Sequence, residues 1–260
     1  MATTTKADTV DLCALQSVDV VLIIENRIYI AYDKNIWALN ANGKTYGVPL
    51  LLTDYIKILP TDFKRLSAAY QTPSGDIILF TNREIYLIRY PSFDLVPTWP
   101  RSFLDFGLPS SARINAAINT NRGRSFVIYN DFLVGEIDDC SMRIKKHHAI
   151  QKIFPGIPPG ITSAFRYIDG HLYFVNRKQY YKLNEFSKTV TSAGEFDLQI
   201  LGAVCPRDGL LQQLRDLLNR IVRMSSAITV IDNSDEEDYE IVSYNSSHYK
   251  RNIEKNRDER

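Results

Sequence analysis

Residues 161–183 read "ITSAFRYIDGHLYFVNRKQYYKL", and this stretch decides the fold. It holds three short apolar runs, rich in aromatic and β-branched residues, that are divided by Asp169-Gly170 and Arg177-Lys178. Such runs predict β-strands, and Asp-Gly predicts a tight turn between paired strands. The stretch is either one isolated meander or one unit of a repeat.

The start of this stretch, Ile161-Thr162-Ser163-Ala164, has three partners elsewhere in the chain. They are "VDVV" at 18–21, "LSAA" at 66–69 and "INAA" at 114–117, so successive starts are 48, 48 and 47 residues apart. Each start leads into a similar pair of apolar runs. Near-constant spacing of this kind indicates a repeat architecture.

The repeat predicts an all-β, four-bladed β-propeller, because four meanders around one axis form that fold. An antiparallel sandwich also has short strands, but it does not predict a 48-residue repeat. Small residues at the third and fourth places of the starts indicate crowding at the axis: Ala68, Ala69, Ala116, Ala117, Ser163 and Ala164. Ser74-Gly75, Arg122-Gly123 and Asp169-Gly170 are expected to form turns with positive φ.

These units resemble the hemopexin-like repeat, which opens with Ile/Val-Asp-Ala-Ala and continues through a glycine turn into aromatic strands. "IWAL" in the first unit and "FPGIPPGI" before the fourth carry the same resemblance. It covers roughly residues 12–206, but only Asp19 keeps the acidic second position. We therefore expect an N-terminal extension (1–11) and a propeller (12–206) with blades at about 13–60, 61–109, 110–157 and 158–206. An amphipathic helix (207–224) and an acidic, polar, disordered tail (225–260) should follow.

The resemblance implies a disulfide between the first and last blades. Cys13 and Cys205 stand where the family's closing pair stands, whereas Cys140 is expected to be an unpaired thiol in a connector. Such a link would stabilise a closed ring by a few kcal/mol. The alternative is a pair of buried thiols that never join, as a reducing compartment would favour.

The resemblance also implies a structural ion on the propeller axis, held by backbone carbonyl groups. The positions that correspond to the family's carbonyl ligands are Asp19, Ser67, Asn115, Thr162, Val21, Ala69, Ala117 and Ala164. Oxygen ligands suit Ca²⁺ or Na⁺. No other cofactor is required.

Sequence motifs for catalysis are missing: there is no GxSxG, HExxH or phosphate-binding glycine loop. We therefore expect a binding protein and no enzyme. His147 and His148, in a basic connector between the third and fourth blades, are weak candidates for heme ligands because some relatives use linker histidines. A solvated connector is the favoured interpretation.

After Cys205 the composition changes. Residues 208–224, "DGLLQQLRDLLNRIVRM", place leucines at helical spacing, which predicts a helix that packs on the propeller, on a partner or on a second copy of the chain.

The tail then resembles a SUMO-interacting motif, in which an apolar strand joins the modifier's sheet edge and adjacent acids meet basic residues. The positions that carry it are Ile228, Val230, Ile231, Asp232, Asp235, Glu236 and Glu237. Ser234 is a candidate phosphosite that would add negative charge. A strand with an acidic turn is the alternative.

Composition and the N-terminal sequence limit the remaining classes of function and location. A net charge of +1 excludes a broadly basic nucleic-acid binder. No apolar run is long enough to enter a membrane as a spanning helix. The N-terminus lacks a secretory signal pattern, which, with the tail motif, favours an intracellular location, nuclear or cytoplasmic; removal of a signal would make the protein secreted. A viral propeller would reconcile secretory-type cysteines with the tail motif.

Three functions follow. The leading one is a non-enzymatic protein-interaction scaffold whose tail recruits SUMO or another protein partner. The first alternative is a secreted module that binds matrix, heme or a polyamine. The second is an assembly protein that forms homo-oligomers through residues 208–224.

Overall fold

The structure of the protein is a computed structural model, which describes residues 10–40, 49–203 and Leu217. The chain divides into two compact units, 1–206 and 207–260. Apart from Leu217, which is helical and exposed, the second unit lies outside the described residues. The predicted helix and tail therefore stay predictions.

Unit one is a four-bladed β-propeller, which confirms the predicted fold class. Each of its four sheets contains four antiparallel strands in sequence order. Blade 1 contains β1 (Val20–Ile24), β2 (Arg27–Tyr32), β3 (Asn35–Asn40) and β4 (Leu50–Leu51). Blade 2 contains β5 (Ala68–Gln71), β6 (Ile77–Phe80), β7 (Glu84–Ile88) and β8 (Arg101–Ser102).

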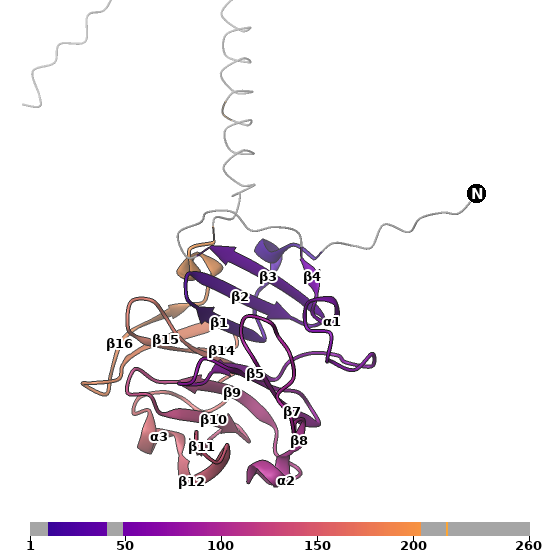
Figure 1. The fold of residues 1–260 in the computed structure, drawn as a ribbon. Helices are drawn as coiled ribbons and strands as arrows, with labels where there is room; N and C mark the ends of the chain where they lie inside the picture. Colours follow the sequence, from indigo (N-terminus) through magenta and orange to yellow (C-terminus); the bar gives the residue numbers. More distant parts are fainter. Residues whose placement is uncertain (1–9, 41–48, 204–216, 218–260) are drawn as a thin grey trace, which may run out of the picture. The chain divides into compact units, whose positions relative to one another are not determined.

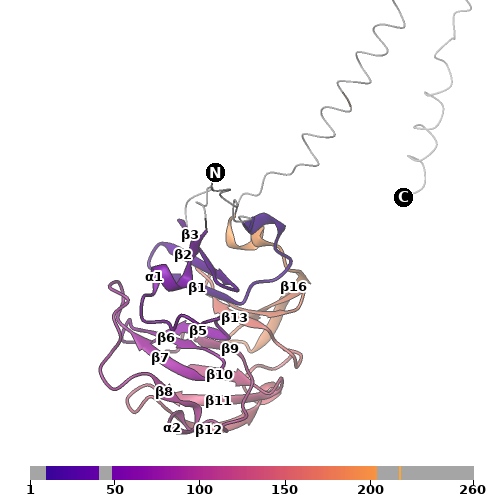
Figure 2. The same ribbon diagram turned by 90° about the vertical axis from the view of Figure 1, so that its right-hand side faces the viewer.

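The third and fourth blades have longer outer strands. Blade 3 contains β9 (Ile114–Asn119), β10 (Ser125–Tyr129), β11 (Leu133–Asp138) and β12 (Arg143–Ala149). Blade 4 contains β13 (Ser163–Arg166), β14 (Leu172–Asn176), β15 (Gln179–Asn184) and β16 (Thr189–Glu195). The sheets follow one another around a common centre in the order of the sequence (Figure 1, Figure 2).

A short helical turn follows the outer strand of every blade. These turns are α1 (Leu52–Tyr55), α2 (Phe103–Phe106), α3 (Ile150–Ile153) and η2 (Leu198–Leu201), and η1 (Leu12–Ala14) precedes the first blade. Each brings apolar side chains into the gap between neighbouring blades, as Phe106 does between blades 2 and 3. They terminate each sheet and direct the chain to the next one.

The core consists of four apolar clusters, one at each junction between neighbouring blades. The cluster between blades 4 and 1 includes Trp37, Phe165 and Val175, together with Leu12 from η1 and Leu201 from η2. The two ends of the propeller therefore meet in one core. Burial of such side chains contributes about 1.5–3 kcal/mol each.

Turn glycines behave as their positions predict. Gly75, Gly123 and Gly170 have φ of 99°, 68° and 76°, a conformation that glycine adopts without steric cost. Cys140 is free and exposed, as predicted, although it lies in the turn between β11 and β12 rather than in a connector between blades. Within the described part of the chain, no helix is long and apolar enough to cross a membrane.

Candidate functional site

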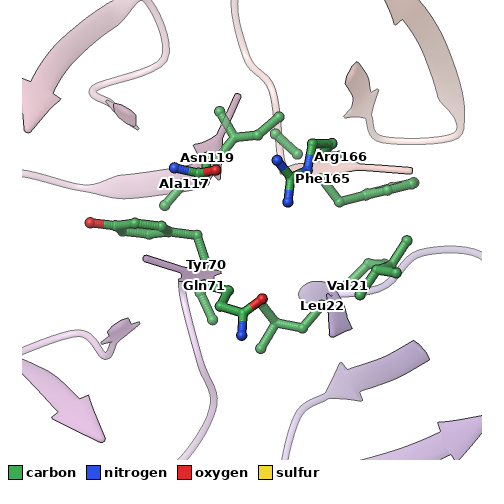
Figure 3. A pocket seen from close by; sticks show the side chains of 12 residues that line it. Val21, Leu22, Tyr70, Gln71, Ala117, Asn119, Phe165 and Arg166 are labelled. Atoms are coloured by element: carbon green, nitrogen blue, oxygen red, sulfur yellow. The ribbon is translucent and has the colours of Figure 1, made fainter. Parts of the chain in front are cut away.

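The innermost strands β1, β5, β9 and β13 contact one another in a ring and enclose an axial tunnel. Its narrow part is a cavity of about 30 Å³, lined by three consecutive residues from each strand (Figure 3). These are Val21–Ile23, Ala69–Gln71, Ala117–Asn119 and Ala164–Arg166. Because they recur at the spacing of the sequence repeat, equivalent residues meet at the axis.

The eight positions expected to surround an axial ion do lie around the tunnel. The first four, Asp19, Ser67, Asn115 and Thr162, line a wider cavity of about 390 Å³ at one end, which we call the mouth. The other four, Val21, Ala69, Ala117 and Ala164, line the narrow part. Three of the four narrow positions are alanines, so the inner strands approach closely. Whether an ion is held there stays a prediction.

Asp19 fixes the first inner strand to the turn between β2 and β3. Its Oδ2 accepts a hydrogen bond of 2.7 Å from the N–H of Asp33, a residue with φ of 49°. Its Oδ1 lies 3.4 Å from Nη1 of Arg65. Burial raises the pKa of Asp19, although the Asp33 N–H and Arg65 act to lower it.

Asn115 performs the same task in blade 3. Its Oδ1 accepts a hydrogen bond of 2.9 Å from the N–H of Asp131, which has φ of 69°, and its Nδ2 donates to Asp131 Oδ1 at 3.0 Å. In blades 1 and 3 the second position of the repeat is therefore a structural acceptor for a left-handed turn residue. An amide serves there as well as a carboxylate, which explains why blade 3 does not keep the acidic residue.

Three cationic side chains gather at the mouth, a cluster that the sequence did not reveal. Arg65, Arg177 and Lys178 line the mouth together with a single carboxylate, that of Asp19. Arg177 and Lys178 form the turn between β14 and β15, and Arg65 precedes β5. The basic pair is visible in the sequence, but only the folded ring brings it beside Arg65.

Among the described residues, one charged side chain, that of Arg166, lines the narrow part of the tunnel. Arg166 donates to the Thr120 carbonyl at 3.4 Å, and Figure 3 shows Arg166 and Asn119 around the opening. Gln71 donates to the Gly75 carbonyl at 3.0 Å. Tyr70 extends away from the axis in the same view, into the junction between blades 2 and 3. No acidic side chain lines this narrow part.

A second groove, of about 570 Å³, lies between η1 and η2 and shares Gln16 and Lys178 with the mouth. Its lining includes Cys13, Glu195 and Asp197. Cys13 is not a free thiol. Cys205 lies outside the described residues, so the predicted pair stays a prediction.

The two candidate heme ligands occupy a strand, not a connector: both lie in β12, the outermost strand of blade 3. Tyr129 Oη lies 2.8 Å from Nδ1 of His147, and Nε2 of His148 lies 3.8 Å from Glu136 Oε2. Adjacent residues of a strand point to opposite faces. The two imidazoles therefore do not converge on one ligand.

Glu136 is a buried carboxylate at the centre of a charge cluster on that face, and its partners Arg124 and Lys145 are partly exposed. Its Oε1 lies 2.8 Å from Nη2 of Arg124 and 3.2 Å from Nζ of Lys145. Burial acts to raise the pKa of Glu136, but the hydrogen bonds from Arg124 and Lys145 outweigh it and lower the pKa. The cluster is a structural tie between strands of blade 3.

The tail positions Ile228, Val230, Ile231, Asp232, Ser234, Asp235, Glu236 and Glu237 lie outside the described residues. Among the residues that the structure describes, no group of three histidine, cysteine or acidic side chains is arranged to hold a metal ion.

Comparison with known proteins finds matrix metalloproteinases as relatives of this chain. No protein-family model matches the chain. The chain is 25% identical over 177 residues to matrix metalloproteinase-2 of Drosophila melanogaster, a match that covers 67% of this chain and 23% of that protein. Matrix metalloproteinase-18 of Xenopus laevis is 30% identical over 135 residues, covering 51% of this chain and 28% of that protein. The chain thus spans about a quarter of the length of these relatives.

Two solved structures share the architecture. The hemopexin fold protein CP4 from cow pea is 12% identical with a TM-score of 0.59, covering 72% of this chain and 96% of that one. A plant lectin with two metal binding sites from Cicer arietinum is 16% identical with a TM-score of 0.59 and the same coverage. At these identities the likeness shows the fold alone. The propeller unit is a hemopexin-like four-bladed β-propeller.

Proposed function

We propose that the chain is a non-enzymatic protein-interaction scaffold in which the mouth of the axial tunnel is the binding surface of the propeller. One observation carries this proposal: every blade contributes to that surface. Asp19, Ser67, Asn115 and Thr162 come from blades 1 to 4, and the polar mouth continues into the groove between η1 and η2. Loops and strand ends on a rigid scaffold are the usual place for recognition.

The flanks of the blades expose little apolar surface to a partner, because most of their apolar side chains are buried in the contacts between neighbouring blades. All four apolar clusters are buried at blade junctions. The large exposed apolar residues of the propeller are scattered over all four blades: Leu50 and Leu51 are adjacent in β4, whereas Leu104 lies in α2 and Phe186 follows β15. A partner is therefore expected at the open end of the tunnel.

The tail supplies the second part of the proposal. Ile228, Val230 and Ile231, followed by the acids Asp232, Asp235, Glu236 and Glu237, would add a strand to the edge of SUMO or a sumoylated partner. Phosphorylation of Ser234 would strengthen the acidic contact. This role would place the protein inside the cell, in the nucleus or cytoplasm.

Titration of the full chain with SUMO, followed by isothermal calorimetry, tests the tail. Replacing Ile228, Val230 and Ile231 with alanine should abolish binding, whereas the matched control Ile253→Ala should not change it. Binding that survives the triple substitution, or no binding by the intact chain at millimolar SUMO, would reject this part of the proposal.

Self-association through residues 208–224 is the alternative use of the second unit. Leu217, one of the residues in the predicted apolar stripe, is helical and exposed. Sedimentation of the full chain and of a variant with Leu211, Leu214 and Leu218 replaced by alanine separates the two uses. A dimer that the variant loses would support assembly, and an unchanged monomer would exclude it.

A Cys13–Cys205 link would close the propeller at the junction of blades 1 and 4. The support is that Leu12 and Ala203, neighbours of these cysteines in the sequence, share one apolar cluster. An oxidised link in the purified native protein would favour the secreted alternative, because disulfides persist in oxidising compartments. A reduced pair would favour the intracellular scaffold.

An axial Ca²⁺ or Na⁺ belongs to the same proposal. Val21, Ala69, Ala117 and Ala164 surround a cavity of about 30 Å³, which is about the space for one small ion or water. Such an ion would stabilise the ring by linking four inner strands. Thermal unfolding with Ca²⁺ and with chelator tests it: a melting temperature that does not respond to either would count against Ca²⁺.

A further inference from the structure

The charges at the tunnel mouth are unbalanced. Arg65, Arg177 and Lys178 face one carboxylate, Asp19. Arg65 lies 3.4 Å from that carboxylate, so Asp19 has a partner already. Neither Arg177 nor Lys178 forms an ion pair with any residue in the described part of the chain. Two cationic groups at the mouth therefore have no counter-charge from the described residues.

Neutral hydrogen-bond donors stand beside these cations. Ser17 and Ser67 line the same cavity, and their hydroxyl groups make no hydrogen bond with the described residues. The Asn115 side chain already forms two hydrogen bonds with Asp131, and the Thr162 hydroxyl donates to the Val175 carbonyl at 3.2 Å. Two hydroxyl groups without a hydrogen bond to the described residues, and two cations without an ion pair to them, thus face one space.

The dimensions of the mouth limit the size of the ligand that it can bind. The mouth encloses about 390 Å³, enough for a small hydrated oxyanion, whereas the tunnel behind it narrows to about 30 Å³. This narrow part, which alanines line, leaves too little space for a tetrahedral oxyanion. Such an anion would therefore stay in the mouth. Arg166, the charged residue that lines the narrow part, adds positive rather than negative charge along the axis.

We propose that the mouth binds a phosphate-type oxyanion, with Arg177 and Lys178 as the charged ligands and Ser17 and Ser67 as hydroxyl donors. A phosphate group carries nearly two negative charges at pH 7 and strong acceptor oxygens, which matches two unpaired cations. The guanidinium fork of Arg177 fits two oxygens of such a group. A cation held deeper on the axis would add to the attraction.

Arg177 carries more of this binding than Lys178. Lys178 also borders the groove that contains Glu195 and Asp197, so part of its field is offset. Arg177 has φ of 55°, and its backbone conformation holds it at the tip of the turn between β14 and β15. Asparagine tolerates positive φ better than most residues, which makes Arg177→Asn the appropriate substitution.

The inference concerns the same surface as the proposed function, but anion binding does not require a protein partner. Calorimetry of the full chain with inorganic phosphate, at constant ionic strength set by NaCl, is the test. We expect one site per chain, an affinity reduced at least tenfold in R177N/K178A, and no change in R89A/K152A. This control removes the same charge from exposed residues that do not line the mouth. K178Q alone, expected to weaken binding severalfold, serves if the double variant does not fold.

Two results would overturn the inference: no heat beyond that of chloride, or equal weakening by R177N/K178A and R89A/K152A, which would indicate non-specific charge screening. A second arm compares a phosphoserine peptide with its serine counterpart. Tighter binding of the phosphopeptide than of free phosphate would identify a protein-borne group as the source. Binding of free phosphate alone would keep the anion site and remove support for a protein partner at the mouth.

Discussion

Asp19 Oδ2 accepts a 2.7 Å hydrogen bond from the backbone N–H of Asp33, and this contact ties the innermost strand of blade 1 to the turn that follows β2. The equivalent contact in blade 3 joins Asn115 to Asp131 at 2.9 Å. Blades 1 and 3 thus share an acceptor, and not a charge, at the second position of the repeat. The tunnel mouth is built on these two ties.

Replacing Asp19 with alanine should destabilise the propeller by about 1–2 kcal/mol, because it removes the acceptor and leaves the Asp33 N–H unpaired. D19N should destabilise the propeller less than D19A, since the amide oxygen of Asn115 accepts the equivalent hydrogen bond in blade 3. Denaturant unfolding of the three proteins provides the measurement. Equal losses for D19A and D19N would show that the charge matters and that the tie does not.

Gly135 should resist substitution by alanine, because the added Cβ would lie 2.9 Å from Cδ1 of Ile144 and 3.2 Å from Cγ1 of Val127. We expect G135A to cost about 1–3 kcal/mol through overpacking. Ile144→Val removes the closest atom, so the double variant G135A/I144V should be more stable than additivity of the single changes predicts. A thermal-unfolding double-mutant cycle measures the coupling; strict additivity would contradict the assigned contact.

Acid should weaken the propeller through Glu136. Its folded-state pKa is lowered by Arg124 and Lys145, so the native state binds this proton less readily than the unfolded chain does. The resulting stability is present above the usual glutamate pKa and is lost as pH falls through the lower, folded value. E136Q should therefore reduce stability at pH 7 and flatten its decline below about pH 4.5.

The exposed Glu195→Gln provides the control for E136Q, because Glu195 forms no ion pair with the described residues. Its unfolding profile against pH should match that of the unmodified protein. If E136Q and E195Q gave the same profile, the Glu136 cluster would have no special electrostatic role.

The Cys13–Cys205 pair leads to a mass prediction. Under native, non-reducing conditions, peptides that contain these two cysteines should be recovered as one linked species, and Cys140 should be alkylated freely. C13S should lower the free energy of unfolding by about 2–5 kcal/mol if the link exists, whereas C140S should not change it. Quantitative alkylation of all three cysteines would contradict the link.

The sequence was sufficient to predict the inner strands around the propeller axis, but it was insufficient to predict the outer strands at the surface. The inner strands could be aligned because crowding at the axis demands small or β-branched residues at fixed places, as Ala69, Ala117 and Ala164 show. The outermost strands lack such a signal. β12 is largely exposed, so "RIKKHHA" has no apolar alternation that would predict a strand at His147 and His148.

The charged mouth could not be predicted for a different reason. Arg65 and Arg177 are more than a hundred residues apart in the sequence and become neighbours only when blade 4 closes against blade 1. Their convergence depends on turn geometry and ring closure, which a single sequence does not encode in any local pattern. The repeat located the tunnel, but not the charge at its end.

The most direct measurement of the claim that the tunnel mouth is the binding surface uses a heavy oxyanion. Crystals of the full chain grown with tungstate, a tetrahedral analogue of phosphate, would be examined by anomalous diffraction. The strongest peak should lie in the mouth, within hydrogen-bonding distance of Arg177 and Ser67, and crystals of R177N/K178A should show no such peak. Peaks confined to lattice contacts or to the flanks of the blades would contradict this claim.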